Sequence, residues 1–433
     1  MHFVQSSYLK LLDYFRISNA FSRNVALLFF SNTLNNLAMF IANVAVARNY
    51  SHEEFGLFSI AATIALTTFS ISEFGMNLTM VRLYKLHIEE KEKAAAILAC
   101  NLYFKIVVVG LLIGVSLVFG HSLSQLFAKT ADHSLMLGIA LTTGGILGFW
   151  SYAKGFFQIH EQFQQIATLT IGYALLRLLM IGGILSLPAT LSPELLFGIV
   201  YLGPLLVVLI YGYSIIGRAI NITALKAREL FSALQESLSY SKWVAASGIS
   251  FVLIQQSTIF MTATLGDLKQ VALLNAALLF TSVFSLLNDS WQQVAFPKIA
   301  GLTKDTIASY RARVFQILPW FFLFSILVIA SLSVVMSFTL GPQYGDSIPL
   351  FWVTSLGTAT TIAFGFFSIL MHSINRPQIS FYVNLFTLAM VVSIGSELMI
   401  KIGLLGLLGW YAFSIATGEL VKSLLISRLT RAL

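Results

Sequence analysis

Apolar stretches long enough to cross a lipid bilayer recur along almost the whole chain of 433 residues. An α-helix rises 1.5 Å per residue, so about 20 apolar residues cross a hydrocarbon layer ~30 Å thick. Twelve such spans are predicted, at about residues 25–47, 55–81, 94–119, 134–157, 163–187, 195–216, 243–264, 271–296, 314–339, 348–372, 379–400 and 404–427. Charged residues make up only 10% of the chain and hydrophobic residues 57%. This composition is typical of an all-α polytopic membrane protein.

The positive charges alternate between the segments that join the spans. With both termini on one side, twenty of the 26 Lys and Arg fall on that side, and two lie inside spans. The opposite side holds only Arg48, Lys129, Lys269 and Lys401. Because Lys and Arg are retained on the cytoplasmic side, both termini are predicted to be cytoplasmic. The same distribution explains the net charge of +8 without a nucleic-acid partner.

The stretch 53–85 has a polar face within an apolar span. Its polar residues recur every three or four positions, as on one face of a helix: Ser59, Thr63, Thr67, Ser70, Glu73 and Asn77. A similar stretch returns 216 residues later, where Asp289 corresponds to Glu73 and Lys298 to Arg82. This match predicts a duplicated unit. We expect an N-terminal six-helix lobe at 1–216, a basic cytoplasmic connector at 217–240 and a C-terminal six-helix lobe at 241–433, around a central cavity.

Two cations lie deep within predicted spans. Lys105 and Arg177 are each close to the middle of the bilayer, where a charge costs at least ~2.5–3.5 kcal/mol on insertion scales. Such a cation either lines a wet cavity or pairs with an acid, for which Glu73 and Asp289 are candidates. The two acids are equally candidates for ion coupling or for pairing with Arg82 and Lys298. Those two bases are in turn either substrate contacts or ordinary charges of the inner boundary.

Uncharged polar residues also cluster inside spans. Asn32, Asn36 and Asn43 form a stripe on the first span, and Gln255 and Gln256 lie in the seventh. Such groups join helices or bind sugar hydroxyls. Glu419 and Lys422, three residues apart in the twelfth span, are predicted to pair with each other.

No catalytic, metal-binding or nucleotide-binding pattern stands out in the chain. The His residues have no partners at ligand spacing, Cys100 is the single cysteine, and no Gly-rich loop ends in Lys-Ser/Thr. We therefore expect no cofactor, no metal and no enzymatic activity.

Several short motifs resemble those of the polysaccharide-biosynthesis (O-antigen type) flippases, in the superfamily that also holds multidrug exporters and the lipid II flippase. The matching residues are Ala47-Arg48, Phe55-Gly56, Glu73 with Gly75, Arg82, the link from Lys154 to Gln165 and the link from Ile374 to Gln378. The chain departs from the family in its seventh span, where many relatives carry an acid and this sequence has Gln255, Gln256, Ser257 and Thr258.

The resemblance implies two six-helix lobes around a cavity that opens alternately to each side. The implied substrate is a polyprenyl-diphosphate-linked oligosaccharide, moved from the cytoplasmic to the outer leaflet of a bacterial inner membrane. Lys105, Arg177, Lys154 and Arg82 are then candidate contacts for the diphosphate, with Lys298 as a further cavity cation. Membrane lipids and other membrane proteins of polysaccharide assembly are further expected partners.

Two other functions fit parts of the pattern. A drug or cation antiporter of the same superfamily should have an acidic or apolar cavity, whereas the deepest charges here are basic. A membrane glycan polymerase usually carries a large outer loop, and no predicted outer loop exceeds about 15 residues.

Overall fold

The computed structural model describes residues 19–186, 191–219, 227–300, 304–368 and 378–432. The first half contains α2 (Asn19–Asn49), α3 (His52–Glu73), α4 (Met76–Leu86), α5 (Lys91–Ala128), α6 (Ser134–Ile159), α7 (Phe163–Leu185), α8 (Pro193–Phe197), the π-helix η1 (Gly198–Leu202) and α9 (Gly203–Ala219). The second half contains α10 (Ala227–Leu265), α11 (Leu268–Ala300), α12 (Lys304–Leu340), the 3₁₀ turn η3 (Pro342–Tyr344), α13 (Ser347–Ser368), α15 (Gln378–Ile402) and α16 (Leu404–Ala432).

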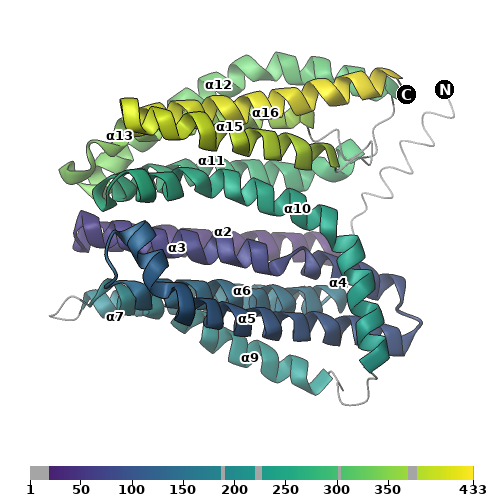
Figure 1. Cartoon of the computed structure of the whole chain (residues 1–433). Coiled ribbons are helices and arrows are strands. Elements are labelled where there is room, and N and C mark those ends of the chain that lie inside the picture. The colour runs from purple at the N-terminus through teal and green to yellow at the C-terminus, as the bar shows by residue number, and fades with distance from the viewer. Residues whose placement is uncertain (1–18, 187–190, 220–226, 301–303, 369–377, 433) are drawn as a thin grey trace.

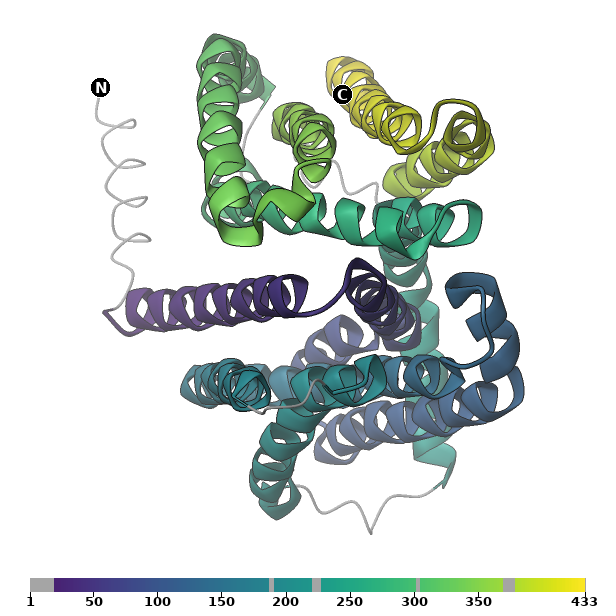
Figure 2. The same cartoon turned by 90° about the vertical axis from the view of Figure 1, so that its left-hand side faces the viewer.

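These helices form two layers that follow the two halves of the chain. Most helices run side by side, with α2 to α9 in the lower group and α11 to α16 in the upper group (Figure 1). The end-on view shows the same separation, with the purple-to-blue half below the green-to-yellow half (Figure 2). Within the described residues, twelve segments are long and apolar enough to span a membrane. The prediction of a twelve-span, two-lobed membrane protein is therefore confirmed.

Helix boundaries repeat along the chain at the predicted shift. α2 ends at Asn49 and α10 at Leu265, and α3 begins at His52 and α11 at Leu268. Each pair is 216 residues apart, the shift that relates the two polar stretches in the sequence. The start of α3 is set by a capping box, in which the Ser51 hydroxyl accepts from the Glu54 amide and the Glu54 carboxylate accepts from the Ser51 amide.

One element differs between the two halves. The polar stretch predicted as a single helix is broken after Glu73, because Phe74 and Gly75 adopt left-handed backbone angles with φ of 49° and 66°. The corresponding region of α11 continues without interruption. The prediction of one continuous polar face from Ser59 to Asn77 was therefore wrong, although α3 and α4 together still form one membrane span.

The first part of α10 lies across the ends of the N-terminal helices before the helix turns into the upper layer (Figure 1). Arg82 of α4 donates to the Tyr240 hydroxyl, and its guanidinium lies 4.4 Å from the centre of that ring. His87 contacts Glu236 at 3.1 Å through Nε2 and Glu90 at 3.0 Å through Nδ1. The described part of the predicted connector is thus a helix docked on the N-terminal lobe, while its boundaries at 217 and 240 stay a prediction.

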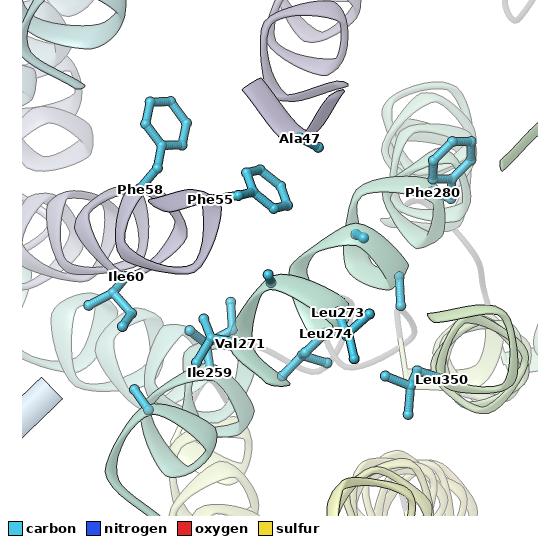
Figure 3. Packing of buried hydrophobic residues seen from close by; sticks show 14 of the residues in the cluster. Ala47, Phe55, Phe58, Ile60, Ile259, Val271, Leu273, Leu274, Phe280 and Leu350 are labelled. Atoms are coloured by element: carbon cyan, nitrogen blue, oxygen red, sulfur yellow. The ribbon is translucent and has the colours of Figure 1, made fainter. Parts of the chain in front are cut away.

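The two lobes meet directly at the end of the molecule that carries Arg48, Lys129, Lys269 and Lys401, here called the Lys/Arg-poor end. The hydrophobic core there is shared, with Phe55 and Ile60 of α3 buried in the same cluster as Ile259, Val271 and Leu274 of the other half. Figure 3 shows Ile60 directed toward Val271 and Ile259. This shared core forms the apolar seal between α3 and α11.

Hydrogen bonds flank the seal. The Tyr344 hydroxyl donates to the Ala47 carbonyl at 3.2 Å, and the His52 ring lies 3.1 Å from the Gln343 carbonyl oxygen. Since η3 belongs to the second half and α2 and α3 to the first, both contacts hold the lobes together at the Lys/Arg-poor end.

Gly56 allows α3 and α11 to approach closely within this seal. A Cβ atom at this position would clash with the backbone carbonyl of Leu268. Backbone cannot move aside as a flexible side chain can, so Gly56→Val should separate the lobes at the Lys/Arg-poor end. Double electron–electron resonance between spin labels at Glu53 and Asp346 should report a longer distance than in the wild-type protein.

The matched control for this substitution is Gly110→Val, because a Cβ at Gly110 has no heavy atom within 4 Å. Cys100 is buried and is replaced by Ala in all labelled proteins. Equal distance distributions for Gly56→Val and the wild-type protein would show that the close approach does not hold the seal.

Docking of α10 should weaken as pH rises. Hydrogen bonds to the Glu90 and Glu236 carboxylates raise the pKa of His87 above its usual ~6.5. Stabilisation by the charged imidazole is therefore complete below that usual value and is lost as pH rises through the raised pKa. Burial raises the pKa of Glu236, but its hydrogen bonds with His87 and Lys93 outweigh burial, so Glu236 stays ionised throughout this range.

Spin labels at Glu89 and Gln235 should accordingly show a broader and longer distance distribution at pH 8.5 than at pH 6. His87→Gln should remove the pH dependence, whereas His160→Gln should leave it intact. A pH response that survives His87→Gln would assign the titration to another group.

Candidate functional site

A cavity of about 730 Å³ lies between the two lobes. It is lined by α2, α3 and η1 from the first half and by α10, α11, α13, α15 and α16 from the second. Asn43 and Ser59 lie at the end of the cavity nearest the seal, since Asn43 is six residues before the end of α2. Lys422 lies at the other end, about 27 Å along α16 from Leu404. The cavity thus extends from the seal toward the Lys/Arg-rich end.

Uncharged polar groups dominate the polar part of the wall. The described lining residues of this kind are Thr33, Asn36, Asn43, Ser59, Thr63, Tyr201, Gln255, Gln256, Asn275, Thr281, Ser282, Ser285, Thr358, Thr361, Asn384, Thr387 and Tyr411. Apolar side chains such as Leu37, Phe40 and Phe251 lie between them and make up the larger share of the wall surface. A wall of amides and hydroxyls between apolar side chains suits a ligand that carries many hydroxyl groups.

Four of the five uncharged residues singled out in the sequence lie on this wall. Asn36, Asn43, Gln255 and Gln256 line the cavity, whereas Asn32 is exposed on α2 and is not among the described lining residues. The Asn43 amide donates to the Met39 carbonyl one turn earlier at 2.8 Å. Helical spacing identified these residues because one face of each helix meets the cavity.

The acid–base pair of α16 also lies on the wall. Lys422 Nζ is 2.7 Å from Glu419 Oε1, and the side chains are only 10% and 13% exposed, so the predicted pairing is confirmed. Among the described lining residues these two are the only charged ones. Sequence reasoning found the pair but not its position. Tyr411, Ile415, Gly418 and Lys422 recur at helical spacing and all line the cavity, but Ile415 and Gly418 are not polar, so the spacing alone does not mark this face.

Lys105 lies inside the N-terminal lobe, where it supports the break between α3 and α4. It is 1% exposed, and its Nζ donates to the Glu73 carbonyl at 3.3 Å. Asn101, one turn earlier on α5, donates to the Met76 carbonyl at 2.7 Å. A cation at the end of α3 also complements the helix dipole. Lys105 is not among the described residues of the cavity wall, and a contact with substrate stays a prediction.

Glu73 caps the start of α4 rather than pairing with Arg82. Its two carboxylate oxygens accept from the backbone amides of Gly75 at 2.8 Å and Asn77 at 2.7 Å. These amides have no helical carbonyl to bond, so the carboxylate satisfies donors that the break exposes. The sequence shows an acid at position 73, but its backbone partners follow only from the break between α3 and α4.

Arg177 on α7 lies one aromatic ring behind the cavity wall. Its guanidinium carbon is 4.2 Å from the ring centre of Tyr173 and 4.9 Å from that of Tyr201, and Tyr201 lines the cavity. The side chain is 2% exposed, and its Nε and Nη1 donate to no atom in the described part of the chain. Tyr201 belongs to η1, and π-helical turns are frequent at functional sites.

The remaining predicted charges lie away from the described wall or outside the described side chains. Lys154 is partly buried on α6, with Nζ 5.2 Å from the centre of the Trp150 ring. Arg82 contacts the docked part of α10. The backbones of Asp289 and Lys298 belong to α11, but their side chains lie outside the described part of the chain. The structure thus brings together the predicted amides and the α16 pair, and does not bring the four described cations to the wall.

Solved structures with the same architecture are membrane transporters. The chain is similar to a lipid II flippase MurJ in an inward closed conformation, with a TM-score of 0.71, 14% identity and coverage of 93% of this chain and 87% of that one. It is also similar to an inward-facing multidrug resistance MATE family transporter of the MOP superfamily, with a TM-score of 0.70, 13% identity and coverage of 92% and 94%. An outward-facing structure from the same MATE family has a TM-score of 0.61 and 13% identity, with 94% of both chains covered. The fold is that of the MOP-superfamily transporters.

The family itself is shown by the sequence. A model of the family described as polysaccharide biosynthesis protein matches residues 21–303, which is more than half of the chain. The chain therefore belongs to the polysaccharide biosynthesis protein family. No curated protein sequence matches it.

Removal of the Glu73 carboxylate should loosen the start of α4. Glu73→Ala leaves two backbone amides without their acceptors, which should cost about 1–2 kcal/mol of local stability. Hydrogen–deuterium exchange of residues 75–80 should become faster by the corresponding factor of about 5–30. Glu73→Gln retains one acceptor oxygen and should give a smaller increase.

Glu92→Ala is the control, because Glu92 is exposed in the first turn of α5. Unchanged exchange in Glu73→Ala would mean that the capping contacts contribute little to the break.

Proposed function

We propose that the protein is a flippase that moves a polyprenyl-diphosphate-linked oligosaccharide from the cytoplasmic to the outer leaflet of a bacterial inner membrane by alternating access. The observation that carries the proposal is the cavity between the lobes, with its wall of amides and hydroxyls, its acid–base pair and its seal at one end. The transported repeat is an O-antigen or similar unit of lipopolysaccharide. The protein moves its substrate across the membrane and makes or breaks no covalent bond in it.

The chemistry of such a substrate matches the cavity. A diphosphate and many hydroxyls are too costly to desolvate in hydrocarbon, so the head group needs a polar path. Amide and hydroxyl side chains replace water around the sugars, while the polyprenyl chain stays in the lipid. A volume of about 730 Å³ accommodates part of an oligosaccharide head group in this conformation.

The distribution of charge and the seal support the proposed direction. Lys and Arg favour the cytoplasmic side, so both termini are cytoplasmic in this proposal and the sealed Lys/Arg-poor end faces outward. The cavity is then accessible from the side where lipid-linked sugars are assembled. The TM-score with the inward-facing MATE structure, 0.70, is higher than that with the outward-facing one, 0.61, which supports the same assignment.

The predicted cations enter this proposal in different ways. Arg177 is the first candidate for a later contact with the diphosphate, because it packs on the ring of Tyr201, which lines the cavity, and its Nε and Nη1 donors lack partners among the described residues. Movement of the lobes that displaces Tyr201 would uncover it. Lys105, Lys154, Arg82 and Lys298 are retained as weaker candidates, and Glu73 and Asp289 as candidate coupling acids.

The alternative is export of drugs or cations by the same alternating movement. The similarity to MATE transporters and the apolar side chains of the wall favour it. However, the one acid among the described lining residues is neutralised by Lys422, which leaves no net negative charge there to attract a cation. The flippase therefore fits the described wall better.

Flipping should respond to membrane potential. An unneutralised diphosphate carries about −2, and each charge gains ~2.3 kcal/mol per 100 mV, so outward passage gains about 4–5 kcal/mol at 100 mV. In proteoliposomes that hold the purified protein and a lipid-linked oligosaccharide, a potassium–valinomycin potential that is negative on the cytoplasmic face should accelerate flipping. The opposite potential should slow it.

Empty liposomes and an efflux assay with a cationic dye are the controls. If flipping responded only to a pH gradient, proton exchange rather than membrane potential would be its driving force. Transport of the dye without any flipping would favour the antiporter.

A further inference from the structure

We propose that Lys422 captures the phosphoryl group of the lipid-linked substrate and that Glu419 occupies the position of that group when the cavity is empty. The inference rests on the proposed function and assigns roles to two residues within its cavity. In the empty protein Lys422 Nζ is 2.7 Å from Glu419 Oε1. A diphosphate carries about two negative charges, whereas the Glu419 carboxylate carries one. The diphosphate oxygens therefore attract the Lys422 ammonium more strongly than this carboxylate does.

The position of the pair matches the level of a lipid phosphate. Lys422 lies about 27 Å along α16 from its start at the sealed end, close to the cytoplasmic boundary of a ~30 Å hydrocarbon layer. Asn43 and Ser59 line the opposite end of the cavity, next to the seal. A substrate whose phosphate stays near the cytoplasmic head groups therefore meets Lys422 first and extends its sugars toward the amides.

The exchange of one anion for the other keeps the positive charge of Lys422 paired at each step. A nearly buried ammonium without an anion is costly in a membrane, so a free Lys422 would not persist in an empty cavity. Glu419 supplies the anion until a phosphoryl group replaces it. The released carboxylate is an acceptor only, and the hydroxyls of the sugar next to the diphosphate are suitable donors for it. The two residues thereby recognise a phosphate and a sugar together.

Close helix packing holds the pair in place. A Cβ at Gly418, which adjoins Glu419, would clash with the hydroxyl of Thr387 on α15. A Cβ at Gly357 of α13 would likewise clash with Ala412 on α16. α16 is thus tightly packed against both neighbours, so the exchange of partners needs side-chain rotation and no movement of the helix.

The test measures binding to the full-length protein in nanodiscs with two probes, a short-chain polyprenyl diphosphate and the same lipid carrying one sugar. Lys422→Gln should weaken binding of both probes about tenfold or more, and Lys422→Arg should retain most of it. Glu419→Gln removes the competing carboxylate, so the sugar-free probe should bind more tightly. The sugar-bearing probe should gain less, because its hydroxyls lose their acceptor.

Two further variants separate these roles from folding. The double variant Glu419→Gln/Lys422→Gln leaves no unpaired charge, so it should fold normally and still bind both probes as weakly as Lys422→Gln. Lys401→Gln is the matched control, because Lys401 and Glu397 form an exposed pair at 3.2 Å on α15 and are not among the described lining residues. It should bind like the wild-type protein.

The inference is overturned if the double variant binds like the wild-type protein, or if Glu419→Gln weakens binding of the sugar-free probe as Lys422→Gln does. If the wild-type protein flips lipid-linked sugars and Lys422→Gln flips them equally well, this inference fails and the proposed function stands. If the wild-type protein neither binds nor flips a lipid-linked diphosphate, both fail.

Discussion

The direct contact of α3 with α11 is the interaction on which the rest of the structure depends. Each lobe packs its own helices, and the lobes share a buried core in which Phe55 and Ile60 lie with Val271 and Leu274. That contact closes the Lys/Arg-poor end and leaves polar surfaces of both lobes facing a cavity. Gly56 makes the approach possible because no side chain stands between its helix and the Leu268 carbonyl.

The two lobes use the same repeated helices for different purposes. In the first lobe the polar stretch is broken, and buried Lys105 and half-buried Glu73 satisfy backbone groups at the break. In the second lobe the equivalent helix continues as α11, and the described charges of the cavity come from α16 instead. A charge inside a span of this protein therefore need not contact a substrate. The backbone groups that a broken helix leaves unpaired in lipid also need polar or charged partners.

Much of the site could be predicted from helical spacing, but its charges could not. Asn36, Asn43, Gln255 and Gln256 reach the cavity because a polar stripe on a membrane helix avoids lipid and has few other places to lie. Lys105 and Arg177 were equally conspicuous, yet they pack against a backbone carbonyl and two tyrosine rings within the first lobe. Depth in the membrane follows from counting residues, whereas the partner of a charge depends on helices distant in the chain.

The sequence by itself determined the twelve spans, their pairing into two related halves and the pairing of Glu419 with Lys422. These features follow from apolar length, from a repeat of 216 residues and from a three-residue separation on one helix. Only the tertiary structure decided that α3 breaks at Phe74, that the lobes close at one end and that the α16 pair faces the cavity. The physical reason is that these outcomes depend on the fit between surfaces of helices far apart in the chain, and no local pattern encodes that fit.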